Sequence, residues 1–517
     1  MTWGYTDMNA SNNVARASSA RWKSLVARSL VVVAASNAAL PVAYATDTAL
    51  ADVPISASTE AVPANVMLAL SVEFPTAQSH ANFSTGAYGV TALGASSTAD
   101  PYFEPTRKYL GYFDPTRCYA YSGSETNGYF YPTASIQGTN YTCSGEWSGN
   151  YMNWATMHVI DVFRWAMTGG ARDQDEPADF SASTPVGVTI LKKAWSNDQG
   201  SKSNFPDKSL ASGNITKYTA LSTSGSNNLI ATVYNKGINV EFSYSNGNSS
   251  GTKYKSYQVR VLVCSGTDTS KHEYADQFYC QKYENADKTK RVYKPVGLIQ
   301  KNLQKMRFGA VGYHNLNGDT YGSDTLLKAW DGGVLKAQIR DTREEVLETG
   351  AFLQDPFPAD RQGDGEVSRT GAINYLNLFG YKAKSYKRYD NVSEMYAVAL
   401  RYLLGPSGIG HVPSYSAIPA GVSTAQRINI KDDFPVITNW IDPVLPASQG
   451  GSCQKQFIIG IGDTNTCGDN CDNNLSGSGY SMDSLVAGER LNGETVNAWT
   501  KKLSGYSLTY DYIAGMA

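Results

Sequence analysis

The amino-acid sequence predicts an α/β protein, in which an open parallel sheet carries large β-rich insertions. Three short apolar runs, at residues 66–70, 307–311 and 457–461, are each followed by polar residues, which is typical of buried strands in a parallel sheet. Helix-like segments lie between the runs, and strands that alternate with helices favour right-handed crossovers. Because more than two hundred residues separate the first run from the second, the chain between them must contain further structure.

Three segments have the apolar spacing of helices, each with one face to bury. The clearest begins near Asn150 and stops at a pair of glycines at residues 169–170. A second covers residues 392–404, with a capping-box pattern at its start and Gly-Pro at its end. A third covers residues 296–304 and leads directly into the second apolar run.

Residues 170–295 are predicted to form a β-rich insertion. Much of this segment alternates apolar and polar residues, most clearly at 238–244, and that period is typical of antiparallel strands with one buried face. Long insertions into surface loops add little closure entropy and are frequent sites of recognition. The insertion is therefore a candidate binding region.

The start of the chain predicts export. Basic residues precede an apolar run at 30–40 and a small-x-small cleavage pattern, so residues 1–45 are predicted to be a signal peptide. Residues 46–63 are predicted to be a linker, because they are rich in Ala, Ser, Thr and Pro without a period. No later run reaches the roughly 18 apolar residues of a membrane-spanning helix, so no transmembrane anchor is expected.

Seven cysteines in an exported chain are expected to be mostly paired. The expected partners are neighbours in sequence: Cys118 with Cys143, and Cys264 with Cys280. The last three cysteines leave an odd thiol: Cys453, Cys467 and Cys471. The extra thiol indicates a partner outside this chain, a free thiol, or a fragment whose other part is missing. Zinc binding is the alternative, but no histidine lies near these cysteines.

The charge balance argues against polyanionic partners. Lys and Arg total 44 against 46 Asp and Glu, a balance that gives no electrostatic footprint for nucleic acid or for an anionic membrane. Charged residues are 17% of the chain, against roughly 25% in an average soluble domain, and there are 34 tyrosines. This composition is typical of an extracellular, loop-rich surface.

Five long motifs follow one another along the chain: YLGYFDPTRCYAY at 109–121, CSGEWSGNYMNWATMHVIDVFRWAMTGGAR at 143–172, GAINYLNLFG at 371–380, YDNVSEMYAVALRYL at 389–403 and CQKQFIIGIGDTNT at 453–466. Together they closely resemble the PilC/PilY family of type IV pilus tip-associated proteins. The resemblance covers most of the chain from about residue 66 onward, and five long motifs are far more specific than any short pattern.

The resemblance implies both a fold and a role. It implies a von Willebrand factor A-like (Rossmann-like) region at residues 64–517, followed in the family by a C-terminal β-propeller with a calcium site, before which this chain is expected to be truncated. It also implies a pilus tip-associated adhesin and assembly factor that supports pilus biogenesis, twitching motility and surface attachment. The implied partners are minor pilins, the pilus tip complex and a receptor on a host or abiotic surface. The implied location is the pilus tip or outer cell surface, reached through the periplasm.

A von Willebrand factor A-like fold can hold Mg²⁺ or Mn²⁺ through an Asp-x-Ser-x-Ser loop at the end of its first strand, because hard divalent ions prefer oxygen ligands. The aligned loop here is residues 71–75, which lacks the leading Asp and has a proline in place of the last hydroxyl. The residues of this degenerate ion site are Ser71, Glu73 and Thr464. We expect a strand end that has kept the fold without the ion, with Glu73 solvated.

A stronger metal candidate is the oxygen-rich loop directly after the third apolar run. Ligands gather at the carboxyl ends of parallel strands, and Ca²⁺ tolerates irregular oxygen shells. The candidate calcium ligands are Asp463, Asn465, Asp469 and Asp472. The spacing does not fit an EF-hand, and a turn held by Asx hydrogen bonds and a Cys467–Cys471 bond is the alternative.

Aromatic residues crowd the segment around the first expected disulfide. Tyrosine offers a large contact area with a polar tip at low entropic cost, which suits recognition. The recognition candidates are Tyr112, Tyr119, Tyr121, Tyr129 and Tyr131. Alternating tyrosines in a hairpin are also explained by cross-strand packing.

Two other functional classes compete with an adhesin: a secreted carbohydrate-active enzyme, and a structural cell-surface protein without a specific ligand. A glycosidase needs two carboxyl groups about 5 Å or about 6.5–9.5 Å apart, and Asp364 with Glu366 is a pair whose separation the sequence does not give. The G-x-S-x-G pattern at 247–251 lies in a polar hairpin, and five scattered histidines suggest no catalytic base. We therefore do not expect an enzyme.

Overall fold

The computed structural model describes residues 62–82, 99–135, 140–181, 183, 187–202, 205–245, 251–264, 279–315, 333–387, 392–405, 423–462, 490–491 and 494–495. All of these residues belong to one compact unit that begins at Val62. The predicted signal peptide at 1–45 lies outside them, as does nearly all of the predicted linker. Within the described ranges, no helix has both the length and the apolar character needed to cross a bilayer.

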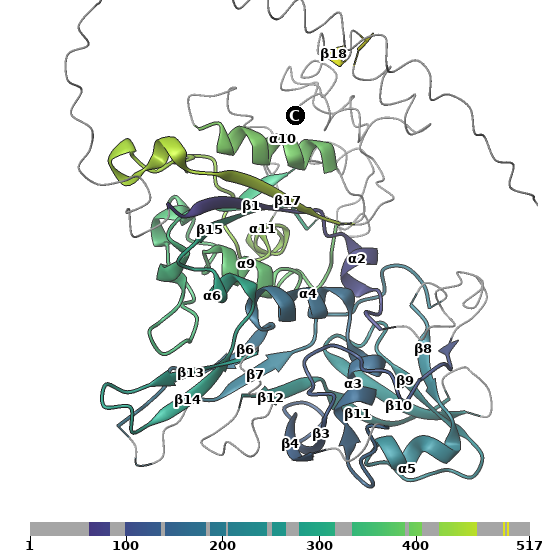
Figure 1. Cartoon of the computed structure of the whole chain (residues 1–517). Coiled ribbons are helices and arrows are strands. Elements are labelled where there is room, and N and C mark those ends of the chain that lie inside the picture. Colours follow the sequence, from purple (N-terminus) through teal and green to yellow (C-terminus); the bar gives the residue numbers. More distant parts are fainter. Residues whose placement is uncertain are drawn as a thin grey trace, which may run out of the picture. The chain divides into compact units, whose positions relative to one another are not determined.

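The central sheet contains the three predicted strands side by side (Figure 1). Its order is β16 (Val334–Ala337), β15 (Met306–Gly312), β1 (Ala64–Leu70), β17 (Gln456–Ile461). The strand β1 pairs in parallel with both β15 and β17, whereas β16 is antiparallel to β15. The predicted α/β class is confirmed, since sheet neighbours far apart in sequence run in the same direction.

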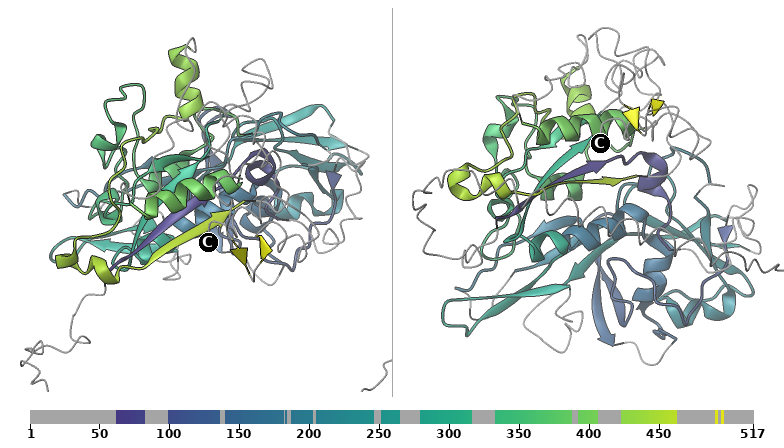
Figure 2. Two further views of the ribbon diagram at one scale, coloured as in Figure 1. Left: turned by 90° about the horizontal axis from the view of Figure 1, so that it is seen from above. Right: turned by 45° about the horizontal axis from the view of Figure 1, so that its top comes forward.

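Apolar side chains cover both faces of this sheet. On one face Val66, Leu68 and Leu70 join a core with Ile160, Ile373 and other residues of the helices listed next. These helices are α2 (Phe74–Gln78), α4 (Val159–Thr168), α6 (Leu298–Lys301) and α9 (Ala372–Leu378). On the opposite face Met67 and Ala69 pack with residues of α10 (Val392–Leu403). Figure 2 shows the resulting helix, sheet, helix order from two further directions.

The strand β17 differs from the prediction in its burial. Phe457 and Ile459 are among the exposed large hydrophobic residues, although the run was expected to be a buried strand. Both residues pair with β1 at the edge of the described sheet, so they have a described neighbour strand on one side.

The predicted helix that begins near Asn150 is two helices. The first, α3 (Gly149–Thr156), ends at Met157, and α4 starts after His158, which is in an extended conformation. The break has a tertiary cause: His158 forms an antiparallel bridge with His80, and Val159 N–H donates to the carbonyl of Ser79 at 2.9 Å. The Asp161 carboxylate accepts from His158 N–H at 3.0 Å and so caps the new helix.

The other two predicted helices differ in outcome. The helix α10 matches the predicted 392–404 closely and is followed by Gly405 with a positive φ of 86°. The predicted helix at 296–304 is reduced to the single turn α6, which begins after Gly297. The chain also contains α11 (Thr424–Lys431) and the 3₁₀ turns η4 (Ser212–Asn214), η7 (Thr342–Glu345), η8 (Pro358–Arg361), η10 (Ala447–Gln449) and η11 (Gly451–Cys453).

Two further sheets form a small domain that is inserted after β1. The five-stranded sheet consists of β2 (Ala99–Asp100), β8 (Asp207–Leu210), β9 (Asn228–Thr232), β10 (Asn239–Ser245) and β11 (Lys253–Gln258). The six-stranded sheet consists of β3 (Arg117–Ser122), β4 (Tyr129–Ser135), β5 (Trp147–Ser148), β6 (Arg172–Asp175), β7 (Thr189–Lys192) and β12 (Arg260–Val263). The neighbouring strands β11 and β12 thus belong to different sheets.

An aromatic core fills the space between these sheets, α3 and α5 (Ile215–Tyr218). Trp147 lies at its centre, with its ring centroid 5.1 Å from that of Phe242 and 5.2 Å from that of Tyr257. The hairpin of β13 (Cys280–Glu284) and β14 (Arg291–Pro295) follows the small domain. Among the described residues near the C-terminus, β18 (Arg490–Leu491) pairs with β19 (Glu494–Thr495).

Candidate functional site

The carboxyl end of β1 is the first candidate site, because the degenerate ion loop lies there. Ser71 is buried, and its Oγ lies 2.9 Å from the hydroxyl oxygen of Tyr313, which follows β15. Glu73 is 3% exposed, so the expectation that it is solvated is wrong. Its Oε1 accepts from Thr76 N–H at 3.2 Å and from Thr76 Oγ1 at 2.9 Å. The carboxylate is therefore the N-cap of α2, which explains why the chain buries it.

A buried cation lies beside this loop. Lys387 is buried and forms a parallel backbone bridge with Glu73, and its carbonyl accepts from Phe74 N–H at 3.1 Å. Its Nζ is 5.5 Å from the ring centroid of Tyr313. An ammonium group here opposes the entry of a divalent ion. In the described part of the chain, no three His, Cys, Asp or Glu residues are grouped so that they could hold a metal, and the loop at β1 does not fit one.

The structure does not describe the other predicted metal ligands. These ligands are Thr464 and the predicted calcium ligands Asp463, Asn465, Asp469 and Asp472. Also outside the described residues are Cys467 and Cys471. Cys453 is described: it is exposed and has no disulfide partner among the residues that the structure covers.

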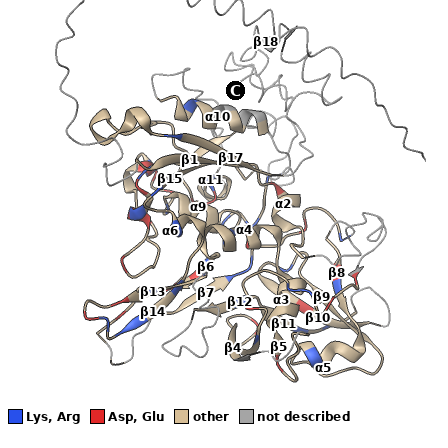
Figure 3. Cartoon of the chain, in the orientation of Figure 1, with Lys and Arg blue, Asp and Glu red and all other residues tan. Residues whose placement is uncertain are grey.

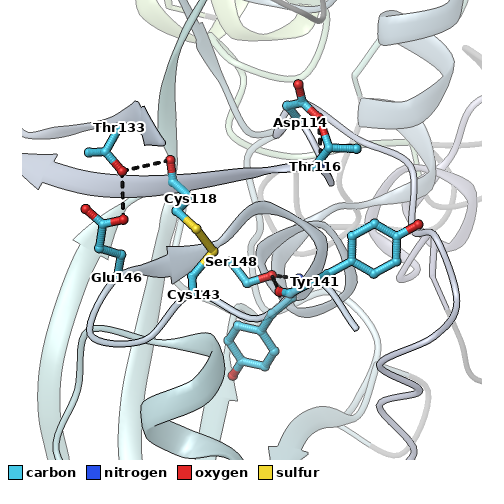
Figure 4. Close-up of a disulfide and its surroundings, with 9 residues drawn as sticks. Asp114, Thr116, Cys118, Thr133, Tyr141, Cys143, Glu146 and Ser148 are labelled. Atoms are coloured by element: carbon cyan, nitrogen blue, oxygen red, sulfur yellow. Dashed lines mark hydrogen bonds between the residues drawn. A yellow bond between two sulfur atoms is a disulfide. The ribbon is translucent and has the colours of Figure 1, made fainter. Parts of the chain in front are cut away.

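Both predicted disulfides are present: Cys118 bonds to Cys143, and Cys264 bonds to Cys280. Figure 4 shows the first of them with its polar surroundings. Thr133 Oγ1 on β4 lies 3.2 Å from the Cys118 carbonyl oxygen and 2.8 Å from Glu146 Oε2, so its single proton can be donated to either. Ser148 Oγ donates to the Tyr141 carbonyl at 2.8 Å and caps α3. The disulfide therefore ties the β3–β4 hairpin to the start of α3.

The prediction of a recognition role is wrong for two of the five tyrosines. Tyr112 and Tyr119 are buried in the aromatic core, so they are not available to a partner. The Tyr112 hydroxyl accepts from Ala171 N–H at 3.2 Å, and the Tyr119 hydroxyl accepts from Asp114 N–H at 2.7 Å. Burial raises the pKa of both phenols well above the usual value. Their hydroxyls satisfy buried backbone groups, which accounts for tyrosine here without recognition.

The other three tyrosines lie nearer the surface. Tyr121 is half-buried; its hydroxyl accepts from Gln258 N–H at 3.1 Å, and its ring packs on that of Tyr257. Tyr129 and Tyr131 are on β4 with ring centroids 6.4 Å apart, and Tyr131 is 36% exposed. Of the predicted set, Tyr131 is exposed, and Tyr129 beside it is half-buried.

The carboxylate pair considered for glycoside hydrolysis is held by cations. Lys431 Nζ donates to Asp364 Oδ2 at 2.6 Å and to Glu366 Oε2 at 2.8 Å. Arg427 Nε donates to Glu366 Oε1 at 2.9 Å. The hydrogen bonds from Arg427 and then Lys431 lower the pKa of Glu366 to about 2. A general acid needs a raised pKa, so this arrangement suits an ion-pair network that joins α11 to the loop between η8 and α9.

Sequence reasoning missed a pocket on the five-stranded sheet. It has a volume of about 330 Å³ and is lined by Thr232, Tyr234, Lys236, Glu241, Ser243 and Lys253, among others. The alternation at 238–244 predicted one outward face, which carries Glu241 and Ser243. Nothing in the sequence indicated that the loop after β9 folds over that face. Charged residues of both signs are interspersed over the described elements (Figure 3).

The described residues thus define an α/β protein with an inserted, disulfide-bonded small domain that has an aromatic core. Residues 100–258 match the family described as PilY1 homolog, small alpha/beta domain. The chain is also 30% identical over 464 residues to the type IV pilus biogenesis factor PilY1 homolog of Xylella fastidiosa. That alignment covers 81% of this chain and 33% of the relative. The chain belongs to the PilY1 family, and it spans about one third of the length of this curated relative.

No solved structure matches the chain.

Proposed function

We propose that this chain is part of a type IV pilus tip-associated adhesin and assembly factor, which supports pilus biogenesis, twitching motility and surface attachment. The observation that carries the proposal is the alignment with a relative named as a type IV pilus biogenesis factor, which extends over 81% of the chain. The proposed partners are minor pilins, the pilus tip complex and a receptor on a host or abiotic surface. The proposed location is the pilus tip or outer cell surface, reached by export through the periplasm.

The proposed fold of the sheet region is von Willebrand factor A-like. The order β16, β15, β1, β17, with β1 central and β16 antiparallel at one edge, supports this proposal. So do the helices on both faces of the sheet. In such a fold the loop after β1 is where a divalent ion binds, and here Glu73 caps a helix instead. Attachment is accordingly proposed to proceed without an ion at this position.

Calcium remains a proposal for the loop after β17. Asp463, Asn465, Asp469 and Asp472 have the oxygen ligands that Ca²⁺ prefers. Calorimetric titration of the whole chain with Ca²⁺, with Asp463→Ala as the comparison, tests the proposal. Heat of binding that the substitution removes would support it, and identical titrations of the two proteins would reject it.

Deletion of the gene tests the pilus role directly. We expect fewer surface pili and a smaller twitching zone, both restored by the complete gene in trans. Complementation with Trp147→Ala tests whether the small domain is needed, since this ring lies at the centre of its core. Normal piliation and twitching in the deletion strain would contradict the assignment and favour the structural cell-surface alternative.

A further inference from the structure

The pocket on the five-stranded sheet has a floor of two buried hydroxyl residues. Thr232 on β9 pairs with Glu241 on β10, and Ser243 lies two residues further along β10, so all three side chains project from the same face. Val240 and Phe242, which alternate with them, point into the aromatic core. The apolar side chains of β10 thus lie on the core side of the sheet, and its polar side chains lie on the pocket side.

A rigid aromatic ring forms one wall of this pocket. Tyr234 follows β9, and its hydroxyl oxygen lies 2.7 Å from the carbonyl oxygen of Asp198 and 2.9 Å from that of Gly200, so its single proton can be donated to either. Its ring stacks on that of Phe205 with centroids 6.3 Å apart and planes at 20°. Because both the hydroxyl and one ring face are fixed, Tyr234 presents its remaining surface to a ligand with little loss of side-chain entropy.

Three lysines surround the opening, and each is paired with a carboxylate. Lys236 Nζ lies 2.8 Å from Glu241 Oε2, Lys202 Nζ lies 2.7 Å from Asp207 Oδ2, and Lys253 Nζ lies 3.2 Å from Glu125 Oε2. The site is therefore dense in charged hydrogen-bonding groups but balanced in charge. An anionic ligand would have to displace the carboxylates, whereas a hydroxyl can donate to a carboxylate and accept from an ammonium at once.

We propose that this pocket binds a neutral sugar, namely a pyranose unit of a surface polysaccharide. The apolar C–H face of a pyranose packs on an aromatic ring, and its hydroxyls can donate to Glu241 and accept from the lysines that line the pocket. A volume of about 330 Å³ lies at the small end of ligand sites, which suits a single ring or the end of a chain. The inference rests on the proposed attachment function and names its receptor class.

Binding of methyl glycosides to the purified whole chain tests this proposal. We expect at least one of the methyl pyranosides of glucose, galactose, mannose and N-acetylglucosamine to give a saturation-transfer NMR signal. Tyr234→Ala should weaken that binding about tenfold or more, equivalent to about 1.4 kcal/mol. Glu241→Gln, which keeps the shape of the side chain, should also weaken it, because the charged acceptor is lost.

The matched control is Tyr254→Ala. Tyr254 is 44% exposed on β11 next to a pocket residue, but its ring packs on Tyr244 on the other face of the sheet. This variant should bind like the wild type. Binding of methyl glucuronide alone, loss of binding in the control equal to that in Tyr234→Ala, or no binding of any neutral glycoside would each overturn the proposal.

A cellular measurement separates this proposal from the pilus role. Cells that carry Tyr234→Ala should keep their pili and twitching but attach less to a polysaccharide-coated surface than cells that carry Tyr254→Ala. Loss of pili in the gene deletion together with no glycoside binding would reject the sugar site and leave the pilus role standing. Glycoside binding by the purified chain, together with normal pili in the deletion strain, would support the sugar site and reject the pilus role.

Discussion

Lys208 and Asp100 form an ion pair with Nζ and Oδ2 2.7 Å apart, and both side chains are 0% exposed. The pair joins β8 to β2 at the edge of the five-stranded sheet. Lys208 Nζ also donates to the carbonyl of Asn82 at 2.7 Å. Burial, opposed by Asp100, lowers the pKa of Lys208 to about 8. Each charge is thus tolerated in the interior only because the other is present.

Removal of one partner should therefore be costly. We expect Asp100→Asn to reduce the free energy of unfolding by about 3–5 kcal/mol, because the Lys208 ammonium is left buried without a counter-charge. Urea unfolding followed by tryptophan fluorescence measures the change. The control is Glu125→Gln, since Glu125 pairs with Lys253 at 3.2 Å with both side chains about half exposed. Its effect should stay within about 1 kcal/mol, and equal effects in the two variants would contradict the argument.

The first disulfide should contribute a comparable amount. Cys118 and Cys143 are 25 residues apart in sequence, and closing a loop of this size is worth about 3 kcal/mol through the unfolded chain. We expect the double variant Cys118→Ser, Cys143→Ser to lose that amount in the free energy of unfolding. Dithiothreitol should destabilise the wild type by more than it destabilises this variant. An identical response of both proteins to the reductant would show that the bond is absent in solution.

The capping role of Glu73 gives a prediction about ions. Glu73→Ala removes the acceptor for Thr76 N–H and Oγ1, and loss of an N-cap costs about 1 kcal/mol. We expect the thermal midpoint to fall by the same amount with and without Mg²⁺ or Mn²⁺. A rise in the midpoint of the wild type with either ion, absent in Glu73→Ala, would show that the loop does hold a metal.

Three of the four strands of the central sheet were predictable, because each of the three is a short apolar run in the sequence. The runs at 66–70, 307–311 and 457–461 became β1, β15 and β17 with ends shifted by at most two residues. The disulfides were predictable for a similar reason, since their cysteines are neighbours in sequence. The local sequence pattern is enough to predict an element when neighbouring residues determine its structure.

Several features that the sequence did not predict depend on tertiary contacts. The break between α3 and α4 comes from the bridge between His80 and His158. The apolar spacing of a helix does not indicate a backbone contact with a residue 78 positions away. Tyr119 and Tyr121 are neighbours on β3, yet Tyr119 enters the core, and its hydroxyl meets Asp114 N–H. The place of Tyr234 in the pocket could not be predicted, because it depends on the contact with the ring of Phe205 and on the outward face of β10.

Lys336 on β16 should make stability depend on pH. It is buried, and burial, opposed by Asp432, lowers its pKa from 10.5 to about 7. Between these values the unfolded chain binds a proton that the folded chain has released. The contribution of Lys336 to the free energy of unfolding therefore rises with pH, by up to about 1.4 kcal/mol per pH unit.

The variant Lys336→Met removes this titration. Relative to the wild type, it should be most stable near pH 6, and its advantage should shrink as the pH rises towards 9. Urea unfolding at several pH values measures the difference. Lys253→Met is the control for the loss of a lysine from the surface, because Lys253 is about half exposed. A difference between Lys336→Met and the wild type that stays constant with pH would contradict the assignment of the shift to Lys336.

The start of α3 makes the closest backbone approach in the disulfide-bonded segment. A Cβ atom on Gly149 would lie 1.9 Å from the carbonyl oxygen of Asp114 and 2.9 Å from the ring of Tyr119. Neither neighbour can move easily, because Asp114 Oδ1 accepts from Thr116 N–H at 2.7 Å and Asp114 N–H donates to the buried Tyr119 hydroxyl.

Gly149→Ala should therefore lower the free energy of unfolding by at least about 1–3 kcal/mol, the usual cost of an extra methyl group in a packed interior. Gly213→Ala is the matched control: it lies in η4 of the same domain, and a Cβ there meets no heavy atom within 4 Å. That substitution should leave stability unchanged or raise it slightly, because alanine restricts the unfolded chain. Equal thermal midpoints for the two variants would mean that the start of α3 does not pack closely against the Asp114 carbonyl. The disulfide would then join two segments that are not otherwise packed together.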